Sequence, residues 1–497
     1  MAIIEWKEFE PSSIGNDFSQ AEQQKFVDDN FTHVTREDIQ NVVDHPADPN
    51  KPKVRVVFDM IELPREKVYD QLGFGTLLRR VVNTIDLAIA LGNEDREVIP
   101  DCKRQKRLLE KSTFRFLKVS DYGTTGVDGS QICDPNSRSG RNNFKAMVFD
   151  LGGGNQSAYG AGGHGLGKLA NVASSQLSTV FFNTISASGS LCAGACLNYQ
   201  TEDDSQQRLA KNASFVKRDN PDGYNVKEVV SFLTQEEASA LSYELFHRTE
   251  IGTDVIIVEP KIIDAEANWK DKILANCIIN FPIAILECAL EVNVGGVELN
   301  ESNIEQKTQD LLQVFTSSIK KDLEKTAEYI KAYKRVGGTI NSRKFAKNIQ
   351  GFGDVELYLY KDSDVTANQV AFFRRQGMAL QPYKSPAYES NYAGVLIVRG
   401  EEGNIFLRSI ELADHQTFGA RSTLESISDT EVKNRKKRLT DWIDMSVSEF
   451  TKIQAKGKLP LKGLDRFIFI PTGANDGDET EDLGVKPQDT VKKPKCC

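Results

Sequence analysis

The sequence lacks the features of membrane-spanning and exported proteins. Its 497 residues contain no run of about 18 apolar residues, the length that a membrane-spanning helix requires. The first residues, MAIIEW, have neither the basic region nor the apolar region of a signal peptide. We therefore expect a cytoplasmic protein with no membrane partner.

Cysteine is scarce and scattered along the chain. Of the eight cysteines, Cys192 and Cys196 have a spacing that suits half of a zinc site. No second cysteine or histidine pair lies near them, so buried or free thiols in a reducing compartment are the preferred interpretation. The final Cys496 and Cys497 resemble a double-cysteine lipidation signal, although an ordinary tail is preferred.

A large excess of one charge is also missing. The 62 basic and 71 acidic residues leave a net charge of -9, which provides no overall argument for nucleic-acid binding. Two basic stretches, 103–107 and 433–438, keep DNA open as a partner. A solvated face or a set of salt bridges is the preferred interpretation of each stretch.

The length predicts two to four domains, and hydrophobic periodicity predicts their elements. Helices are expected at 35–45, 75–91, 167–176, 269–290, 303–335 and 429–456. Strands are expected at 53–60, 115–120, 178–188, 254–258, 354–361, 368–373 and 393–398, with a Gly-Gly hairpin at 290–299. Twelve of the 36 glycines lie between residues 121 and 168, which indicates a lid that orders around a ligand.

Three polar residues share one face of the helix expected at 35–45. Glu37, Asn41 and Asp44 are spaced i, i+4 and i+7. Hydrolysis of a terminal phosphate needs a carboxylate that deprotonates water and an oxygen ligand for Mg²⁺, and Glu37 and Asn41 suit these roles. A solvated polar face competes with this interpretation. A second helix has Arg79 where the acid would precede Asn83, and we expect it only to pack.

Asp121 follows the strand expected at 115–120 and enters a turn. A carboxylate there accepts a hydrogen bond from the exocyclic amine of adenine, a donor that guanine lacks at that position. Gly123 and Gly126 let the backbone approach a bound base closely.

A second glycine-rich segment combines a nest of backbone N–H groups with the start of a helix, which suits phosphate oxygens. Its residues are Gly163, His164, Gly165, Leu166, Gly167 and Lys168. Lys168 adds a point charge, and His164 is interpreted as a spacer. The segment is not a Walker A loop, because Leu169 stands where that loop has a hydroxyl residue.

In this order, segments 36–44, 121–126, 162–168 and 252–255 resemble the N, G1, G2 and G3 boxes of the GHKL superfamily (gyrase B, heat-shock chaperones, histidine kinases and MutL). The resemblance covers roughly residues 30–410 and is closest in texture to bacterial MORC-like or phage-defence GHKL ATPases. In the family, one residue usually separates the G1 glycines, whereas two separate Gly123 from Gly126, so the role of Gly126 stays open.

The resemblance implies ATP and Mg²⁺ as cofactors and assigns the site residues. Glu37 would be the catalytic base and Asn41 the Mg²⁺ ligand. Asp44 would support the adenine pocket, and Thr253 would help to fix Asp121 against the base. A basic residue from the second domain would sense the terminal phosphate, and the candidates are Lys344, Lys361, Arg374 and Arg375.

The implied fold class is α+β, with a Bergerat-type ATP-binding α/β sandwich, a transducer-like (ribosomal S5-like) α/β domain and a helical C-terminal segment. The expected parts are an arm at 1–30, the ATP domain at 31–262, the transducer-like domain at 263–412, a helical region at 413–472 and a disordered tail at 473–497. Within the ATP domain, we expect a lid at about 121–168 and an insertion at about 190–245.

The implied function is that of an ATPase whose lid closure and homodimerisation act as a clamp or switch. DNA is the expected partner, in defence against phage, with a separate effector protein. A histidine kinase is disfavoured because no helix with a phosphoacceptor histidine precedes the site. A chaperone-like ATPase that remodels a protein partner, or a nucleotide-binding scaffold with little hydrolysis, remains the alternative.

Overall fold

The computed structural model describes most of the chain up to residue 452. The described ranges are 3–9, 30–92, 97–133, 142–149, 167–218, 229–261, 268–335, 340–386, 388–412 and 417–452, without the side chains of 30–33 and 167–169. Contacts divide the chain into two units, 1–452 and 453–497, and the second lies outside the described residues. The tail expected at 473–497 and the Cys496–Cys497 pair therefore lie outside them as well.

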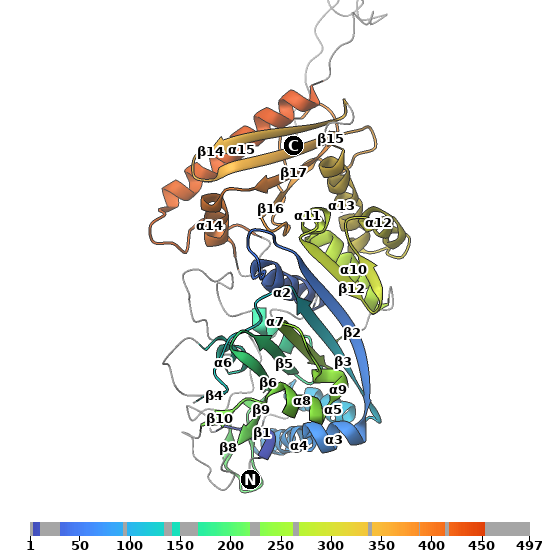
Figure 1. The fold of residues 1–497 in the computed structure, drawn as a ribbon, viewed down its shortest axis with the longest axis vertical. Helices are drawn as coiled ribbons and strands as arrows, with labels where there is room; N and C mark the ends of the chain where they lie inside the picture. The colour runs from blue at the N-terminus through green and yellow to red at the C-terminus, as the bar shows by residue number, and fades with distance from the viewer. Residues whose placement is uncertain are drawn as a thin grey trace, which may run out of the picture. The chain divides into compact units, whose positions relative to one another are not determined.

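A mixed sheet of 11 strands organises the first part of the chain (Figure 1). Its order is β13-β12-β2-β3-β11-β5-β6-β9-β10-β4, with β1 paired to β9. The strands are β1 (Ile3–Glu8), β2 (Val54–Pro64), β3 (Thr113–Tyr122), β4 (Ile132–Cys133), β5 (Thr179–Ser186), β6 (Gly189–Leu197), β9 (Asn212–Arg218), β10 (Val230–Ser231), β11 (Gly252–Val258), β12 (Leu290–Val294) and β13 (Val297–Leu299). A separate hairpin joins β7 (Thr201–Glu202) to β8 (Arg208–Leu209).

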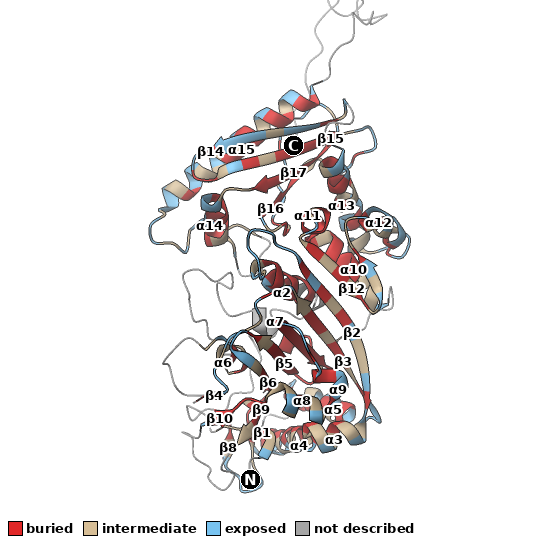
Figure 2. Ribbon diagram, viewed as in Figure 1, coloured by how far each residue is buried: buried red, intermediate tan, exposed pale blue. Residues whose placement is uncertain are grey.

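Helices cover both faces of this sheet because its central strands carry apolar side chains on both sides. In β3, Phe116 belongs to the core on the side of α3, α4 and α5, whereas Leu117 belongs to the core shared with α2, α7 and α10. The helices are α2 (Asn30–Asp44), α3 (Arg65–Leu72), α4 (Phe74–Ala90), α5 (Val98–Leu109), α6 (Asn143–Val148), α7 (Gly167–Ala173), α8 (Gln235–Leu241), α9 (Tyr243–Phe246) and α10 (Trp269–Asn280). The buried strands between them are visible in Figure 2.

A second sheet of four strands, β14-β15-β17-β16, organises the later part of the chain. Its strands are β14 (Ser342–Ile349), β15 (Gly353–Lys361), β16 (Gln369–Phe373) and β17 (Tyr392–Val398), and the helices here are α11 (Pro282–Leu286), α12 (Ile304–Leu312), α13 (Ser318–Lys334), α14 (Glu401–Ile410) and α15 (Asp429–Thr451). One face of the sheet packs on α13, in a core that continues to the first sheet, and the other packs on α14 and α15. The α+β class is therefore confirmed.

Several elements differ from the sequence-based expectations. The helix expected at 269–290 is two helices, α10 and α11, because Pro282 cannot continue the hydrogen bonding of α10 and begins a new helix instead. The helix expected at 303–335 is also two helices, α12 and α13. The sequence analysis missed α3, α5, α6, α8, α9, α14, β1, β4, β6, β7, β8, β9, β10 and β14. The Gly-Gly hairpin is confirmed, with Gly295 and Gly296 at positive φ.

Two expected segments contribute to the main sheet. The region expected to be an insertion, 190–245, supplies most of β6 together with β9 and β10, so it is part of the sheet. From the arm expected at 1–30, β1 pairs with β9 of the same chain. Arg80 of α4 is buried and forms an ion pair with Glu8 of β1 at 2.8 Å, which fits the expectation that α4 is a packing helix.

Candidate functional site

Helix α2 presents the candidate acid and amide away from the core. Ile39 and Val42 of α2 are buried in the core of the sheet, whereas Glu37 is half-buried and Asn41 is exposed. The 3.6-residue period separates these faces, so the apolar positions anchor the helix and leave the polar ones accessible. Two of the three residues on the face that the sequence assigned to chemistry, Glu37 and Asn41, are therefore accessible to solvent.

The chain that leaves α2 is joined to the turn that follows β3. The amide of Ala47 donates to the carbonyl oxygen of Gly123 at 2.8 Å, and Pro46 and Thr124 form an antiparallel bridge. This connection brings the end of the N-box segment beside the turn that carries Asp121.

Both glycines of the turn are required by close approaches of the backbone. Gly123 and Gly126 have φ of +75° and +65°, a region that favours glycine. A Cβ on Gly123 would lie 2.5 Å from the carbonyl oxygen of Lys53, and one on Gly126 would lie 2.2 Å from that of Ile185. The extra residue in the turn thus leaves Gly126 with a steric role against β5.

Residues of strand β11 hold Asp121 in place through hydrogen bonds. The backbone N–H of Thr253 donates to the Asp121 carboxylate. The Thr253 hydroxyl lies 3.1 Å from that of Thr184, which donates to the Gly252 carbonyl at 3.0 Å and accepts from the amide of Val127 at 2.9 Å. Thr184 of β5 thus links β11 to the G1 turn. Sequence reasoning missed Thr184 because an isolated threonine within a strand has no distinguishing pattern.

The carboxyl group of Asp121 is perturbed by its surroundings. Burial raises its pKa to about 6, and Asp254 pushes in the same direction. Hydrogen bonds from Thr124 and Thr253 and the positive charge of Arg248 oppose that rise. Perturbed groups of this kind gather at functional sites.

A second buried acid lies on the inner side of α2. Asn171 of α7 donates to Asp38 at 2.8 Å, which joins α2 to the helix that follows the G2 segment. Burial raises the pKa of Asp38 to about 7, and the charges of Glu37 and Asp121 add to the rise. The sequence analysis did not single out Asp38, because its position next to Glu37 turns it toward the interior.

The segment that was expected to bind phosphate is only partly described. Gly163, His164, Gly165 and Leu166 lie outside the described residues, as do residues 134–141 and 150–162 of the expected lid. Helix α7 begins at Gly167, where the sequence predicted a helix to start, and the side chain of Lys168 is not described.

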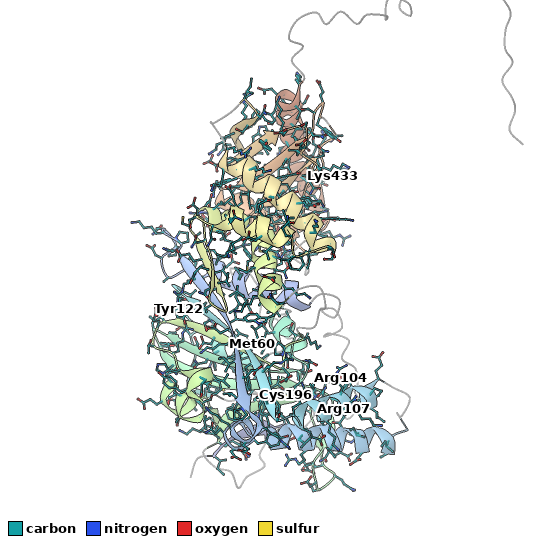
Figure 3. All side chains as sticks on the ribbon, turned by 90° about the vertical axis from the view of Figure 1, so that its right-hand side faces the viewer. Met60, Arg104, Arg107, Tyr122, Cys196 and Lys433 are labelled. Atoms are coloured by element: carbon teal, nitrogen blue, oxygen red, sulfur yellow. The ribbon has the colours of Figure 1, made fainter. Side chains whose placement is uncertain are left out.

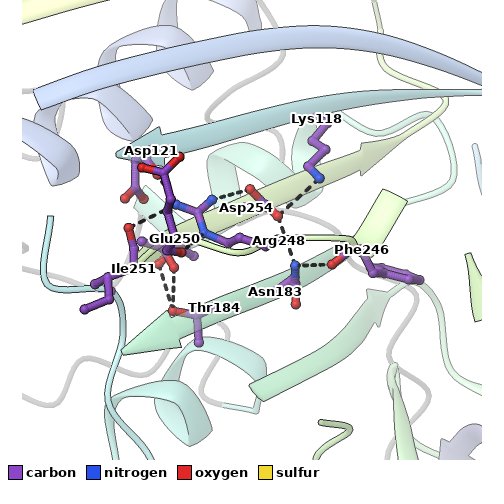
Figure 4. Close-up of polar contacts among 12 residues, drawn as sticks. Lys118, Asp121, Asn183, Thr184, Phe246, Arg248, Glu250, Ile251 and Asp254 are labelled. Atoms are coloured by element: carbon purple, nitrogen blue, oxygen red, sulfur yellow. Dashed lines mark hydrogen bonds and ion pairs between the residues drawn. The ribbon is translucent and has the colours of Figure 1, made fainter. Parts of the chain in front are cut away.

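A buried ionic cluster lies behind Asp121 (Figure 4). Arg248, which precedes β11, donates to the Asp121 carbonyl oxygen and to the Asp254 carboxylate. Asp254 also pairs with Lys118 at 3.3 Å and accepts from Asn183 at 3.0 Å. Sequence reasoning missed Arg248 because the turn that carries it has no motif.

The part of the chain that contains the second sheet contacts α2 at two places. Arg36 donates to the carbonyl oxygen of Ala379, in the loop after β16, at 2.9 Å. Arg408 of α14 pairs with Asp44 at 2.8 Å, and the Asp44 side chain is only 3% exposed. The carboxylate that was expected to support the adenine pocket is therefore engaged with the second part of the chain.

The four basic candidates for phosphate sensing occupy two locations. Lys344 pairs with Glu356 at 2.6 Å, and Lys361 donates to the Phe450 carbonyl oxygen at 2.7 Å. Arg374 is buried against Glu411, and Arg375 is exposed. Both arginines belong to the loop after β16 that also holds Ala379, the residue bound by Arg36.

The two basic stretches lie far apart, and many of their charges have partners (Figure 3). In α15, Arg435 and Arg438 pair with Glu431, each at 2.9 Å, and Lys437 pairs with Asp441 at 3.1 Å. In α5, Arg104 pairs with Asp101, whereas Lys103 and Arg107 are exposed. The α15 stretch therefore stabilises its own helix, and α5 presents the more open basic face.

The described part of the chain also bears on metal binding, on the cysteines and on membrane insertion. There, no group of three or more His, Cys, Asp or Glu side chains is arranged to hold a metal ion. Cys192 and Cys196 are buried free thiols, as expected. No helix of the described segments is both long and apolar enough to cross a membrane.

The described residues fit an adenine nucleotide with Mg²⁺. The Asp121 carboxylate supplies an acceptor for an exocyclic amine, and the Asn41 amide supplies an exposed oxygen of the kind that Mg²⁺ prefers. At the contact of α2 with α7, buried oxygens of Thr35, Asp38 and Asn171 have no hydrogen-bond partner in the described structure. Such orphaned acceptors are typical of a site that a ligand or water completes.

Comparisons with known proteins give matches among solved structures. No family model matches the sequence, and no curated protein matches it. Among solved structures, the chain is similar to the ATPase region of Saccharomyces cerevisiae topoisomerase II bound to ICRF-187 (dexrazoxane), with 10% identity, a TM-score of 0.31, and coverage of 84% of this chain and 86% of that chain. A second structure of that ATPase region has 9% identity and a TM-score of 0.31, with coverage of 89% of this chain and 93% of that chain. The 43K ATPase domain of Thermus thermophilus gyrase B in complex with an aminocoumarin has 10% identity and a TM-score of 0.27, with coverage of 68% of this chain and 79% of that chain. At these identities and TM-scores, the matches do not assign a family or a function to the chain.

Proposed function

We propose that the protein binds and hydrolyses ATP in the manner of the GHKL ATPases. The observation that carries the proposal is the convergence of four separate segments. The segment after α2 is hydrogen-bonded to the G1 turn through Ala47, α7 is hydrogen-bonded to Asp38 of α2, and β11 is hydrogen-bonded to Asp121. These contacts bring together segments that are far apart in the sequence, which supports a shared nucleotide site.

In this proposal each polar group has one task. Glu37 accepts a proton from the attacking water, and Asn41 offers an oxygen to the metal. Asp121 accepts from the adenine amine, and Thr253 holds the carboxylate in place. The backbone N–H groups of 163–168, with Lys168, contact the phosphates. Mg²⁺ neutralises phosphate charge and lowers the barrier to attack by water.

We further propose that ATP closes the lid and joins two copies of the chain. The links from α2 to the second sheet, through Arg36 and Arg408, support a switch in which the state of the site is felt in that part of the chain. The loop after β16 carries Arg375, which is our candidate for the residue that senses the terminal phosphate.

DNA is the partner that we propose, in defence against phage, with a separate effector protein. The exposed Lys103 and Arg107 of α5 favour this choice over a chaperone-like role, because exposed basic side chains bind phosphates through charge. The alternative of a protein client, or of a scaffold with little hydrolysis, predicts that DNA has no effect on turnover.

The experiment is steady-state ATP hydrolysis by the wild type and Glu37→Ala, with and without double-stranded DNA. The exposed Asp59→Ala on β2 is the matched acidic control. Glu37→Ala should bind ATP with unchanged affinity, accumulate as a dimer and lose about 100-fold or more of turnover, the contribution of a general base. Full turnover in Glu37→Ala would overturn the assignment of the base.

The DNA arm of the experiment uses salt and a second variant. Stimulation by DNA should weaken steeply as salt rises and should fall in a Lys103→Ala/Arg107→Ala double variant, because phosphate contacts release counterions. Stimulation by a protein, with no response to DNA, would support the chaperone-like alternative.

A further inference from the structure

We propose that Arg248 is a positioning residue for base selection, which holds Asp121 as the acceptor that distinguishes adenine from a base carrying an oxygen at position 6. The proposal rests on the proposed function, since it concerns the same nucleotide site. It assigns a role to a buried arginine that none of the four sequence motifs contains.

The first observation is the number of bonds that fix the guanidinium group. Arg248 donates to the carbonyl oxygens of Asp121, of Glu250 at 2.8 Å and of Ile251 at 3.3 Å, and to the carboxylate of Asp254. Its side chain is 2% exposed. An arginine held at this many points orients the backbone that it binds, and here that backbone belongs to Asp121.

The second observation is the space that the chain leaves for this contact. Gly252 has a φ of +141°, and a Cβ there would lie 2.0 Å from the Arg248 guanidinium and 2.4 Å from the Asp121 carbonyl oxygen. A side chain at residue 252 would therefore separate the two groups. The glycine of the G3 segment permits the approach of Arg248 to Asp121.

The third observation is the stacking on Tyr122, the residue after Asp121. The guanidinium carbon of Arg248 lies 4.8 Å from the Tyr122 ring centroid, and that of Arg55 lies 4.9 Å from it. Cation–π contacts of this kind restrict the ring. The Asp121–Tyr122 segment is thus held through both the backbone and the neighbouring side chain.

The fourth observation is the balance of charge behind the site. Arg248 and Lys118 are cations that share one buried anion, Asp254. An ionised Asp121 supplies the second negative charge and completes the balance, whereas a neutral Asp121 would leave one excess positive charge in a region of low dielectric. The cluster therefore favours the carboxylate form of Asp121.

The charged groups around Asp121 come from several elements. Asp254 of β11 disfavours the ionised form of Asp121. Asp38 of α2 interacts with the same group, and the charge of Asp121 raises the pKa of Asp38. Arg248 is the cation that opposes the effect of Asp254. Lys118 of β3 contacts Asp254, and Arg55 of β2 contacts Tyr122. Removal of Arg248 would take away the positive charge that opposes burial and Asp254, so the pKa of Asp121 should rise.

This change has a consequence for recognition of the base. A carboxylate accepts from the amine at position 6 of adenine and repels an oxygen at that position. A protonated carboxyl group can instead donate to such an oxygen. Loss of Arg248 should therefore weaken the discrimination against a 6-oxo base near neutral pH, and discrimination should return as pH rises.

The test compares the dissociation constants of ATP and inosine 5′-triphosphate by calorimetry, from pH 5 to pH 9, for the full chain. Arg248→Gln removes the charge, and Arg248→Lys keeps it. Arg55→Gln is the matched control, because Arg55 stacks on the same ring without donating to Asp121. In Arg248→Gln at pH 7, we expect the preference for ATP over inosine 5′-triphosphate, measured as the ratio of their dissociation constants, to fall about tenfold, which corresponds to a shift of one pKa unit. The preference should return at high pH. Arg248→Lys and Arg55→Gln should keep most of it.

The outcomes separate this proposal from the proposed function. A wild type that binds neither nucleotide would contradict the ATP site itself. A wild type that binds ATP, together with an Arg248→Gln variant whose preference is unchanged or whose affinity for both nucleotides falls equally at every pH, would overturn the role of Arg248. If Arg248→Gln does not fold, the test rests on nucleotide binding by Arg248→Lys and by the wild type across the same pH range. Wild-type preference should then fall as pH drops through about 6, where Asp121 protonates, and a flat profile would contradict the proposal.

Discussion

Arg408 of α14 donates to the carboxylate of Asp44, the last residue of α2, at 2.8 Å. Earlier in the same helix, Arg36 donates to the Ala379 carbonyl oxygen at 2.9 Å. The polar positions Glu37 and Asn41 lie between these two attachments. The helix that carries the candidate chemistry is therefore tied on both sides of its polar face to the part of the chain that contains the second sheet.

The Arg408–Asp44 pair should contribute measurably to stability. Arg408→Ala leaves a carboxylate that is 3% exposed without its cation, although the arginine itself is 30% exposed. We expect the free energy of unfolding to fall by about 1–3 kcal/mol, between the values for exposed and buried pairs. Urea denaturation provides the measurement. Lys437→Ala, which removes an exposed pair with Asp441, should change stability by less than about 1 kcal/mol.

Asp38 should make stability depend on pH in an unusual direction. Its folded-state pKa of about 7 lies above the ordinary value of 3.8, so the folded chain binds the proton more tightly than the unfolded chain. The stabilisation from this group is complete below the ordinary value and is lost as pH rises to about 7, with a limiting slope of about 1.4 kcal/mol per pH unit.

Asp38→Asn isolates this effect, because asparagine retains an oxygen that can accept from Asn171. As pH rises from 4 to 8, the free energy of unfolding of the wild type should fall relative to that of Asp38→Asn. Denaturation at several pH values measures it. A difference that does not change with pH would show that Asp38 is ionised in the folded protein.

Asp121→Asn should weaken nucleotide binding strongly without unfolding the chain. Asparagine has nearly the same volume but carries an amide, which lacks the second acceptor oxygen and the charge of the carboxylate. We expect ATP affinity to fall more than about tenfold, or 1.4 kcal/mol, by calorimetry. Asp59→Asn, an exposed substitution on β2, is the control. Unchanged affinity in Asp121→Asn would contradict its role in binding adenine.

Gly126 and Gly92 form a matched pair for the G1 turn. Both have a φ of +65°, but a Cβ on Gly126 would lie 2.2 Å from the Ile185 carbonyl oxygen, whereas one on Gly92 would have no atom within 4 Å. Each alanine substitution should cost about 1–2 kcal/mol for backbone strain. Gly126→Ala should cost more because of the clash and should also weaken ATP binding. Thermal denaturation and calorimetry provide the readouts, and equal effects would show that the turn adapts.

The sequence located the polar residues better than it located their partners. The spacing of Glu37 and Asn41 on a helix and the position of Asp121 after a strand both follow from local periodicity, and the structure bears out those elements. Arg408, Arg248 and Asn171 stand apart in the sequence from the groups that they bind. No local pattern indicates such partners, because they are selected by strand order and helix packing.

The sequence alone determined the α+β class, the helices and strands that carry or adjoin the four motifs, and the four motifs that suggest an adenine nucleotide. These features depend on period, turn residues and glycine content, which act over a few neighbouring positions. Only the tertiary structure decided that 190–245 supplies strands of the main sheet, that Asp44 pairs with the second part of the chain, and that Arg248 lies behind Asp121. Burial and long-range pairing create these contacts, and both exist only after distant segments have packed together.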